Sequence, residues 1–197
     1  MPSRLDEIRS KRNTIRFSEA ARRDFGPWWN SWEEHHEKWS RTTIAAVKEL
    51  EDREGVALPA DYRQFVTEVA DGGLGPGCGM FSVSEAFGEA PSFTGPLAKE
   101  FPYGTADASS ILARRAQGER QLSLDQPNED GLPGGCLLLA HTGCGCFDVL
   151  VITGEQRGFV WYHDMNALFP LGHGMTPLTF LDWYESWLDS WLRRSAR

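Results

Sequence analysis

Three short apolar runs, joined by short connections, constrain the fold of this chain more than any other feature of the sequence. The runs cover residues 136–140, 147–153 and 159–162, and turn-forming residues separate them. Strands with such short connections must run antiparallel, because a parallel crossover needs about a dozen residues or more. The runs therefore predict a three-stranded meander. Because its strands are mostly apolar, we expect helices to cover at least one face of the sheet.

An aromatic helix is predicted directly after the meander. It begins around Thr176 or Thr179, with Pro177 in its first turn. Large side chains then recur along one stripe at helical spacing, at Phe180, Trp183, Trp187 and Trp191. Since large aromatic side chains are normally buried, we expect this stripe to pack against the sheet.

Two more helices are predicted before the meander, which makes the expected fold class α+β. The first spans residues 42–54 and ends at Gly55. Its expected inner face consists of Ile44, Val47 and either Leu50 or Glu51. The second starts at Pro59 and ends at residues 71–73. It carries apolar residues on one face, at Tyr62, Phe65, Val66 and Val69.

Weaker patterns lie between these helices and the meander. Residues 72–79 are rich in glycine and predict an irregular loop. A short strand is expected at residues 80–83, followed by a helical turn that Ser84 caps and that extends through Phe87. Residues 109–117 are expected to be helical.

Charge is distributed unevenly along the chain. Residues 1–23 hold seven basic and three acidic side chains, a net charge of +4, which leaves −12 for the rest of a chain whose total is −8. Such an acidic body disfavours nucleic acid, whose backbone requires Lys and Arg, and favours a basic protein partner. We find no apolar run long enough to span a membrane and no apolar N-terminal segment, so a cytoplasmic protein is expected.

The first forty residues are expected to form an N-terminal extension. Residues 1–23 are polar and predict a mobile or weakly helical basic arm. Tryptophans at helical spacing in residues 28–39 predict a short helix that docks its rings on the body. The expected single domain then covers residues 41–192, and residues 193–197 form a tail.

Four residues form the strongest candidate for a metal site: Cys136, His141, Cys144 and Cys146. Their spacing differs from the paired Cys-x-x-Cys pattern that zinc sites favour. Small buried thiols beside glycines are the simpler interpretation. We therefore predict no metal and no cofactor.

A catalytic set can also be drawn from this region. It would combine Cys144 with His141 or His163 and with Asp148 or Asp164. Nothing in the spacing specifies such a set, because triads are defined by geometry rather than by order along the chain. A Cys-dependent enzyme is therefore the least favoured of the functions considered.

Four short motifs follow one another along the chain. The first is Leu-Pro-Ala-Asp-Tyr-Arg-Gln-Phe at residues 58–65, followed by Asp71-Gly72-Gly73. The second is Gly-Cys-Gly-Cys-Phe-Asp at residues 143–148, which runs into an apolar strand. The third is Arg-Gly-Phe-Val-Trp at residues 157–161 with Asp164 after it, and the fourth is Phe-Leu-Asp-Trp-Tyr at residues 180–184 with a later Trp-Leu pair.

In this order the four motifs resemble the SUKH superfamily, which includes the yeast Smi/Knr cell-wall regulators and many bacterial immunity proteins. Asp71 stands where an Asn is frequent in the family. The resemblance covers about residues 41–192 and implies an α+β fold with a mixed or antiparallel sheet packed with helices. It implies no catalysis.

The resemblance also implies a function. Bacterial members commonly bind and block a cognate toxin, often a nuclease, so we expect a cytoplasmic immunity protein that occludes a basic toxin. A regulatory adaptor that binds a housekeeping protein, as in the yeast branch, is the alternative. The expected partner contacts are acidic and aromatic residues near the loops, namely Glu85, Glu89, Asp148, Trp161 and Asp164.

Overall fold

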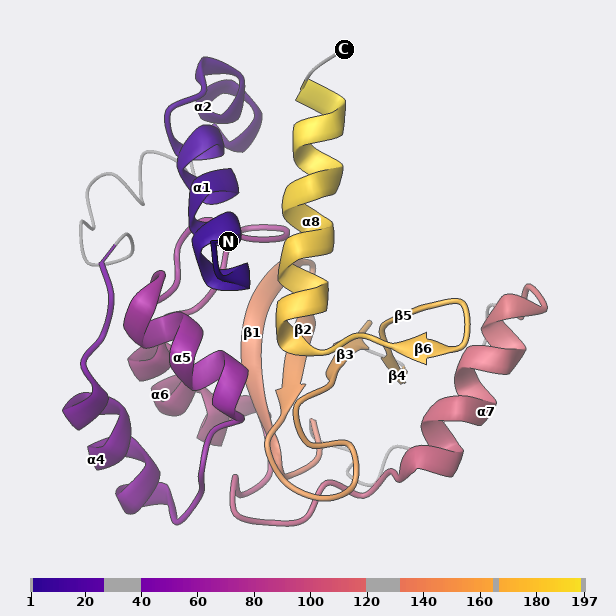
Figure 1. The fold of residues 1–197 in the computed structure, drawn as a ribbon. Helices are drawn as coiled ribbons and strands as arrows, with labels where there is room; N and C mark the ends of the chain where they lie inside the picture. The colour runs from indigo at the N-terminus through magenta and orange to yellow at the C-terminus, as the bar shows by residue number, and fades with distance from the viewer. Residues whose placement is uncertain (1, 27–39, 120–131, 165–166, 196–197) are drawn as a thin grey trace.

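The computed structural model describes residues 2–26, 40–119, 132–164 and 167–195, and an antiparallel sheet lies at its centre (Figure 1). Within these ranges the main sheet has four strands in the order β1-β2-β3-β4. Their bounds are Cys136–Gly143 for β1, Cys146–Val151 for β2, Val160–His163 for β3 and Leu168–Pro170 for β4. The three-stranded meander is confirmed. The sequence analysis missed β4, which is only three residues long.

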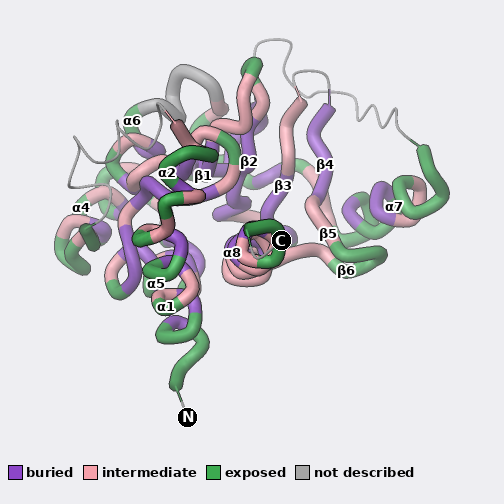
Figure 2. The backbone as a smooth tube through the Cα atoms, turned by 90° about the horizontal axis from the view of Figure 1, so that it is seen from above, coloured by how far each residue is buried: buried purple, intermediate pink, exposed green. Residues whose placement is uncertain are grey.

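Both faces of the sheet are buried. Along β2, Leu150 packs into one hydrophobic core, whereas Val149 and Val151 pack into the other. Figure 2 shows the buried residues concentrated on the strands, with the exposed residues on the outer sides of the helices. This double burial explains the continuous apolar runs, because a strand covered on both faces has no polar side to alternate with.

Most of the helices gather on the first core. They are α1 (Arg4–Arg16), α2 (Glu19–Phe25), α4 (Ile44–Glu54), α5 (Ala60–Glu68), α6 (Val83–Phe93) and α8 (Phe180–Ser195). The second core is closed by α7 (Thr105–Ala116), which lies near β4 on the other side of the molecule (Figures 1 and 2). The α+β prediction is confirmed, as are the helices predicted at residues 42–54, after Pro59 and at 109–117.

The inner face of α4 differs from the prediction in one respect. Val47 and Glu51 are buried, but Ile44 is 70% exposed because it stands in the first turn, at the start of the helix. Thr43 caps the helix by accepting a hydrogen bond from Ala46 N.

The aromatic helix α8 begins at the later of the two predicted positions, directly after Thr179. Pro177 is not in its first turn but in the short strand β6 (Thr176–Pro177), which pairs with β5 (Gly172–His173). Thr179 caps α8, since its hydroxyl accepts from Asp182 N at 3.3 Å and donates to the Asp182 carboxylate at 2.7 Å. The predicted stripe is confirmed as core packing, with Phe180, Trp183 and Trp191 buried and Trp187 half-buried.

The expected strand at residues 80–83 was wrong. Met80 makes only isolated bridges, to Gly73 and Ala140, and α6 begins immediately afterwards at Val83. Ser82, rather than Ser84, caps this helix, because its hydroxyl accepts a hydrogen bond from Glu85 N at 3.2 Å.

The expectation of a mobile or weakly helical basic arm was also wrong. Residues 4–16 form α1, capped by Ser3 and Asp6 in a reciprocal pair of hydrogen bonds. Ile8 and Ile15 are fully buried, so the helix is part of the core rather than an appendage. The predicted Trp-rich helix at 28–39 lies outside the described residues. The domain boundary at residue 40 stays a prediction.

Candidate functional site

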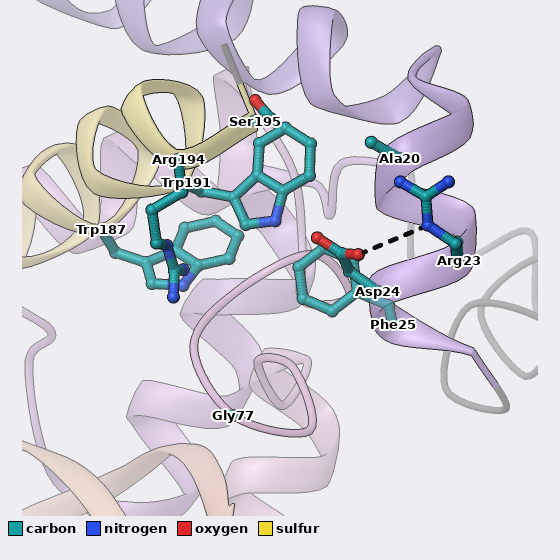
Figure 3. A pocket seen from close by; sticks show the side chains of 9 residues that line it. All are labelled: Ala20, Arg23, Asp24, Phe25, Gly77, Trp187, Trp191, Arg194 and Ser195. Atoms are coloured by element: carbon teal, nitrogen blue, oxygen red, sulfur yellow. Dashed lines mark ion pairs between the residues drawn. The ribbon is translucent and has the colours of Figure 1, made fainter. Parts of the chain in front are cut away.

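A groove opens between α2 and the C-terminal end of α8, and we call it the α2–α8 groove (Figure 3). Its volume is about 540 Å³. The residues that line it come from three segments far apart in the sequence, and they are Ala20, Arg23, Asp24, Phe25, Gly77, Trp187, Trp191, Arg194 and Ser195. Clefts of this size are typical of binding sites.

Three aromatic rings form the floor of the groove. The ring of Phe25 at the end of α2 lies 6.2 Å from the ring of Trp187 and 6.3 Å from that of Trp191, nearly parallel to the latter at 18°. Trp191 is only 4% exposed, whereas Phe25 and Trp187 are half-buried. Phe25 and Trp187 therefore supply most of the aromatic surface that a bound molecule could touch.

Charged side chains stand at the rim. Arg23 comes from α2 and Arg194 from α8, and both are exposed (Figure 3). Asp24 lies beside Arg23, with 4.0 Å between the guanidinium nitrogen and the carboxylate oxygen. Aromatic and arginine side chains together are the composition that dominates binding energy at protein interfaces.

The loop at the lower edge of the groove is held by a buried arginine on α1. The Arg12 guanidinium donates to the carbonyl oxygens of Gly72 at 3.0 Å and Leu74 at 2.7 Å, and to the Tyr184 hydroxyl. Tyr184 in turn donates to Leu74 O at 2.8 Å. A buried guanidinium needs several acceptors, so α1, the Gly-rich loop and α8 are fixed to one another at this point.

Gly77 is the loop residue that borders the groove, and its position is tightly constrained. Its φ of +59° lies in the left-handed region, and a Cβ atom there would come within 2.5 Å of His141 O. The neighbouring Cys78 N donates to that same carbonyl oxygen at 2.8 Å. The loop is thus tied to β1 as well as to α1, which makes the wall of the groove rigid.

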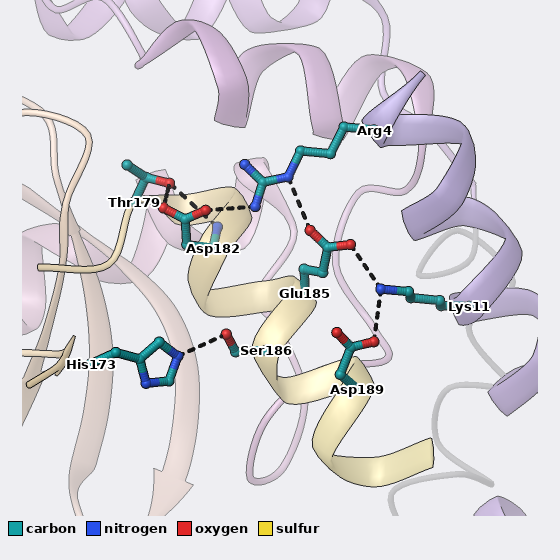
Figure 4. Close-up of polar contacts among 8 residues, drawn as sticks. All are labelled: Arg4, Lys11, His173, Thr179, Asp182, Glu185, Ser186 and Asp189. Carbon is teal, nitrogen blue, oxygen red and sulfur yellow. Dashed lines mark hydrogen bonds and ion pairs between the residues drawn. The ribbon is translucent and has the colours of Figure 1, made fainter. Parts of the chain in front are cut away.

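On the other flank of α8, the basic residues of α1 meet a row of carboxylates (Figure 4). Arg4 pairs with Asp182 at 2.6 Å and with Glu185 at 3.0 Å. Lys11 pairs with Glu185 at 2.8 Å and with Asp189 at 2.7 Å. Two positive charges of the N-terminal segment are therefore engaged within the molecule.

Two of the residues predicted to contact a partner lie in the interior. Trp161 is 0% exposed, and its ring stacks on Tyr103 at 5.5 Å and meets the edge of Phe101 at 5.1 Å. Asp148 is 4% exposed and hydrogen-bonded to the Trp183 side chain. Burial raises the pKa of Asp148 to about 7, although the bond to Trp183 acts in the opposite direction. A partner bound to this fold would touch neither side chain.

The other three predicted contacts have separate locations. Glu85 takes part in capping α6, since its carboxylate accepts from Ser82 N at 2.8 Å. Glu89 is also on α6, and its side chain lies outside what the structure describes. Asp164 follows β3 and accepts from Ala167 N at 2.8 Å. The five residues do not form one described surface, and their role in binding a partner stays a prediction.

The cysteines do not gather into one site. Cys136 pairs with Val151 at one end of the β1–β2 hairpin, whereas Gly143 pairs with Cys146 at the other end. Cys136 is buried, which raises the pKa of its thiol to about 12, and Cys144 is exposed at the hairpin tip with φ of 51°. Across the described ranges, no group of three or more His, Cys, Asp or Glu side chains could hold a metal ion.

One version of the catalytic set drawn from the sequence, Cys144 with His141 and Asp148, is divided by the sheet. His141 packs against Phe147, with ring centroids 5.1 Å apart, on the face of the second core. Asp148 is the next residue of β2 and points to the opposite face, where Trp183 holds it. Asp148 therefore cannot orient His141 for Cys144.

Sequence reasoning missed the α2–α8 groove. The aromatic stripe marked Trp187 and Trp191 as core residues, and nothing in the sequence placed Phe25 beside them. The sequence shows arginines near both ends of the chain but does not show that they lie together. Only the packing of α2 against α8 brings Arg23 and Arg194 to one rim.

Comparison with known proteins adds to this description. A protein-family model, described as "SMI1 / KNR4 family (SUKH-1)", matches residues 41–182. No curated protein and no solved structure matched the chain. In the part of the chain that the structure describes, no helix is long and apolar enough to cross a membrane. The family match covers well over half of the chain and runs from the start of α4 into α8. The chain therefore belongs to the SMI1 / KNR4 family (SUKH-1).

Proposed function

We propose that this protein is an immunity-type member of the family that binds a toxin protein and neutralises it by occlusion, without catalysis of its own. The family match over residues 41–182 is the observation that carries the proposal. Two further findings support it: the buried Asp148 is separated from His141, and the cysteines of the β1–β2 hairpin do not converge on one site.

The charge of the body favours a basic partner. Outside residues 1–23 the chain carries a net charge of −12. The basic side chains Arg4 and Lys11 are paired within the molecule, where their two positive charges offset two of the three negative charges of Asp182, Glu185 and Asp189 on α8. A negative surface steers a basic protein toward it and accelerates association at low salt. We therefore propose a basic toxin, such as a nuclease, met in the cytoplasm of a bacterial cell.

The test is co-expression with the protein encoded by the adjacent gene. If the proposal holds, the neighbour arrests growth when expressed alone, growth recovers when this chain is present, and the two proteins purify as one complex. A neighbour that is harmless and forms no complex overturns the toxin proposal. A stable complex with a harmless neighbour would favour the alternative, an adaptor for a housekeeping protein.

The electrostatic part of the proposal has its own readout. Raising the salt concentration from about 50 to 500 mM should slow association of the purified pair by about tenfold or more, because salt screens the attraction between exposed charges. Dissociation should change much less. An association rate that is insensitive to salt would contradict steering by the acidic body, even if the complex itself is confirmed.

A further inference from the structure

We propose that the α2–α8 groove binds an acidic segment of a partner protein, with one aromatic or large aliphatic side chain on the ring floor and carboxylates at Arg23 and Arg194 (Figure 3). This proposal is separate from the proposed neutralisation of a toxin, because the groove would select an acidic segment whereas the toxin is proposed to be basic. The inference rests on the floor, the rim, the rigidity of the walls and the place of the groove in the chain.

The floor is suited to one large apolar side chain. Phe25 and Trp187 present half-buried rings on a surface that is otherwise polar at its edge. Aromatic rings prefer an offset or edge-on partner about 4.5 to 7 Å away, and such pairs add about 0.5 to 1.5 kcal/mol beyond the area they bury. A groove of about 540 Å³ has room for a side chain and the backbone on either side of it.

The rim is basic although the whole chain is acidic. Arg23 and Arg194 stand on different helices, and both are exposed and line the groove. Asp24 partly offsets Arg23, but both side chains are largely exposed, at 79% and 54%, and their closest approach is 4.0 Å. An exposed pair of this kind contributes little, so an incoming carboxylate can replace Asp24 at modest cost. The planar guanidinium matches a carboxylate in geometry as well as charge.

This charge pattern favours an acidic peptide over a nucleic acid. The chain as a whole carries a net charge of −8, which repels a long polyanion. A short acidic segment meets only the local rim, because charges more than about 8 Å away are largely screened at physiological salt. The concave floor is also better matched to a single side chain than to a row of stacked bases.

The walls are held in place before anything binds. Arg12 fixes the Gly-rich loop to α8, and Gly77 is confined by the His141 carbonyl. Ala21, at the centre of α2, is fully buried in the first core. A rigid site avoids the entropic cost of ordering loops and side chains on binding.

The place of the groove in the chain sets it apart from the family domain. Among the residues that the structure describes, Gly77 is the only one inside residues 41–182, the range that the family model matches, that lines the groove. The other lining residues come from α2 and from the last turns of α8. The groove is thus built mainly by α2 and the last turns of α8, which lie outside the range that the family model matches.

The experiment measures binding of short fluorescein-labelled peptides by fluorescence anisotropy at about 150 mM salt. The probe is Asp-Glu-Phe-Glu-Asp, and the comparison peptides are Asp-Glu-Ala-Glu-Asp and Lys-Lys-Phe-Lys-Lys. We expect the acidic Phe peptide to bind at least tenfold more tightly than either comparison peptide, because only it satisfies both floor and rim. No binding of the acidic Phe peptide up to millimolar concentration overturns the inference.

Variants of the intact chain locate the site. Arg23→Glu and Arg194→Glu should each weaken peptide binding about tenfold, and Trp187→Ala should weaken it by a similar factor. Arg193→Glu is the matched control, since it makes the same change of charge one residue from Arg194 but does not line the groove. Its effect should stay below about threefold. Melting temperatures should confirm that every variant is folded. If Arg193→Glu and Arg194→Glu then weaken peptide binding equally, the attraction is non-specific and the inference is overturned.

Two further measurements exclude other occupants. A labelled single-stranded oligonucleotide that binds as tightly as the acidic Phe peptide, and loses binding in Arg194→Glu, would assign the groove to nucleic acid instead. Self-association in sedimentation experiments that disappears in Arg23→Glu would assign it to a second copy of the chain. Because none of these assays contains a toxin, their outcome is independent of the co-expression test.

Discussion

Two carboxylates are buried almost equally in two regions of this molecule, and they are stabilised in opposite ways. Glu51, at the corner between α4 and α5, is 5% exposed, and Asp148, on the sheet beneath α8, is 4% exposed. Glu51 accepts hydrogen bonds from the Arg63 guanidinium and from Leu58 N. Asp148 has the Trp183 side chain as its hydrogen-bond donor, and its pKa is raised to about 7.

The difference shows what burial does to a carboxylate with and without a cation. At Glu51 the charge is neutralised, and the residue joins α4, α5 and the link between them into one unit. At Asp148 a neutral indole cannot compensate the negative charge, so the sheet favours the protonated form. Burial alone therefore does not indicate a functional acid, and substitution of each carboxylate should change stability in opposite directions.

Removing the compensated carboxylate should have the largest effect. Glu51→Ala leaves the buried Leu58 N–H without an acceptor and strands the Arg63 guanidinium, so we expect the free energy of unfolding to fall by about 3 to 4 kcal/mol. Urea denaturation at pH 7 measures this loss. A decrease below about 1 kcal/mol would show that Arg63, which is 43% exposed, recovers its hydration fully.

Neutralising the uncompensated carboxylate should instead stabilise the fold. The folded-state pKa of Asp148 lies above its usual value of 3.8, so the stability of the wild type falls as the pH rises from about 4 to about 7 and is then constant. Asp148→Asn removes this dependence, and at pH 8 it should raise the free energy of unfolding by about 2 kcal/mol, since the amide retains an acceptor for Trp183 but must also bury its NH₂ group.

The check is a series of urea denaturation curves between pH 4 and pH 8. The advantage of Asp148→Asn should shrink as the pH falls from 8 to 4, because the folded wild-type carboxyl takes up a proton near pH 7 whereas the unfolded one stays largely ionised down to about pH 4. A difference that is constant over the whole range would mean that the substitution acts through packing and not through the charge of Asp148.

Much of the framework that surrounds these two sites follows from the sequence. The apolar runs predicted the meander. The spacing of the aromatic residues predicted the buried face of α8, which includes the Trp183 side chain that is hydrogen-bonded to Asp148. On α4, the helical spacing left Leu50 and Glu51 as equal candidates for the inner face. Only tertiary contact decides between them, because Arg63 and Leu58 N make burial of the glutamate favourable.

Other features could not be read from the chain because they depend on contacts between distant segments. One face of α1 is buried and consists of Leu5, Ile8, Arg12 and Ile15. From the sequence alone an arginine on that face indicates a polar, exposed face, because its burial depends on the carbonyl groups of Gly72 and Leu74. Trp161 and Asp148 were assigned to a binding surface as aromatic and acidic residues near the loops. The alternation of side chains along strands that are covered on both faces turns them inward. The α2–α8 groove likewise needs both ends of the chain.

The hydrogen bond from Trp183 should account for part of the behaviour of Asp148. Trp183→Phe keeps most of the ring packing but removes the donor, so the pKa of Asp148 should rise further above about 7. At pH 8 we expect a loss of about 1.5 kcal/mol in unfolding free energy, with a smaller loss in the Asp148→Asn background. A double-mutant cycle measures the coupling, and full additivity would contradict a direct bond between the two side chains.

The smallest effect is expected at a carboxylate beside Glu51 on the same helix. Asp52 pairs with Lys48 at 2.8 Å, but both side chains are exposed, at 65% and 69%. Water already solvates both charges, so Asp52→Ala should change the free energy of unfolding by about 0.5 kcal/mol or less. Urea curves in low and high salt test this, since salt should remove what little difference exists. A loss comparable to that of Glu51→Ala would mean that helix propensity or charge, rather than burial with a bound cation, distinguishes neighbouring carboxylates on α4.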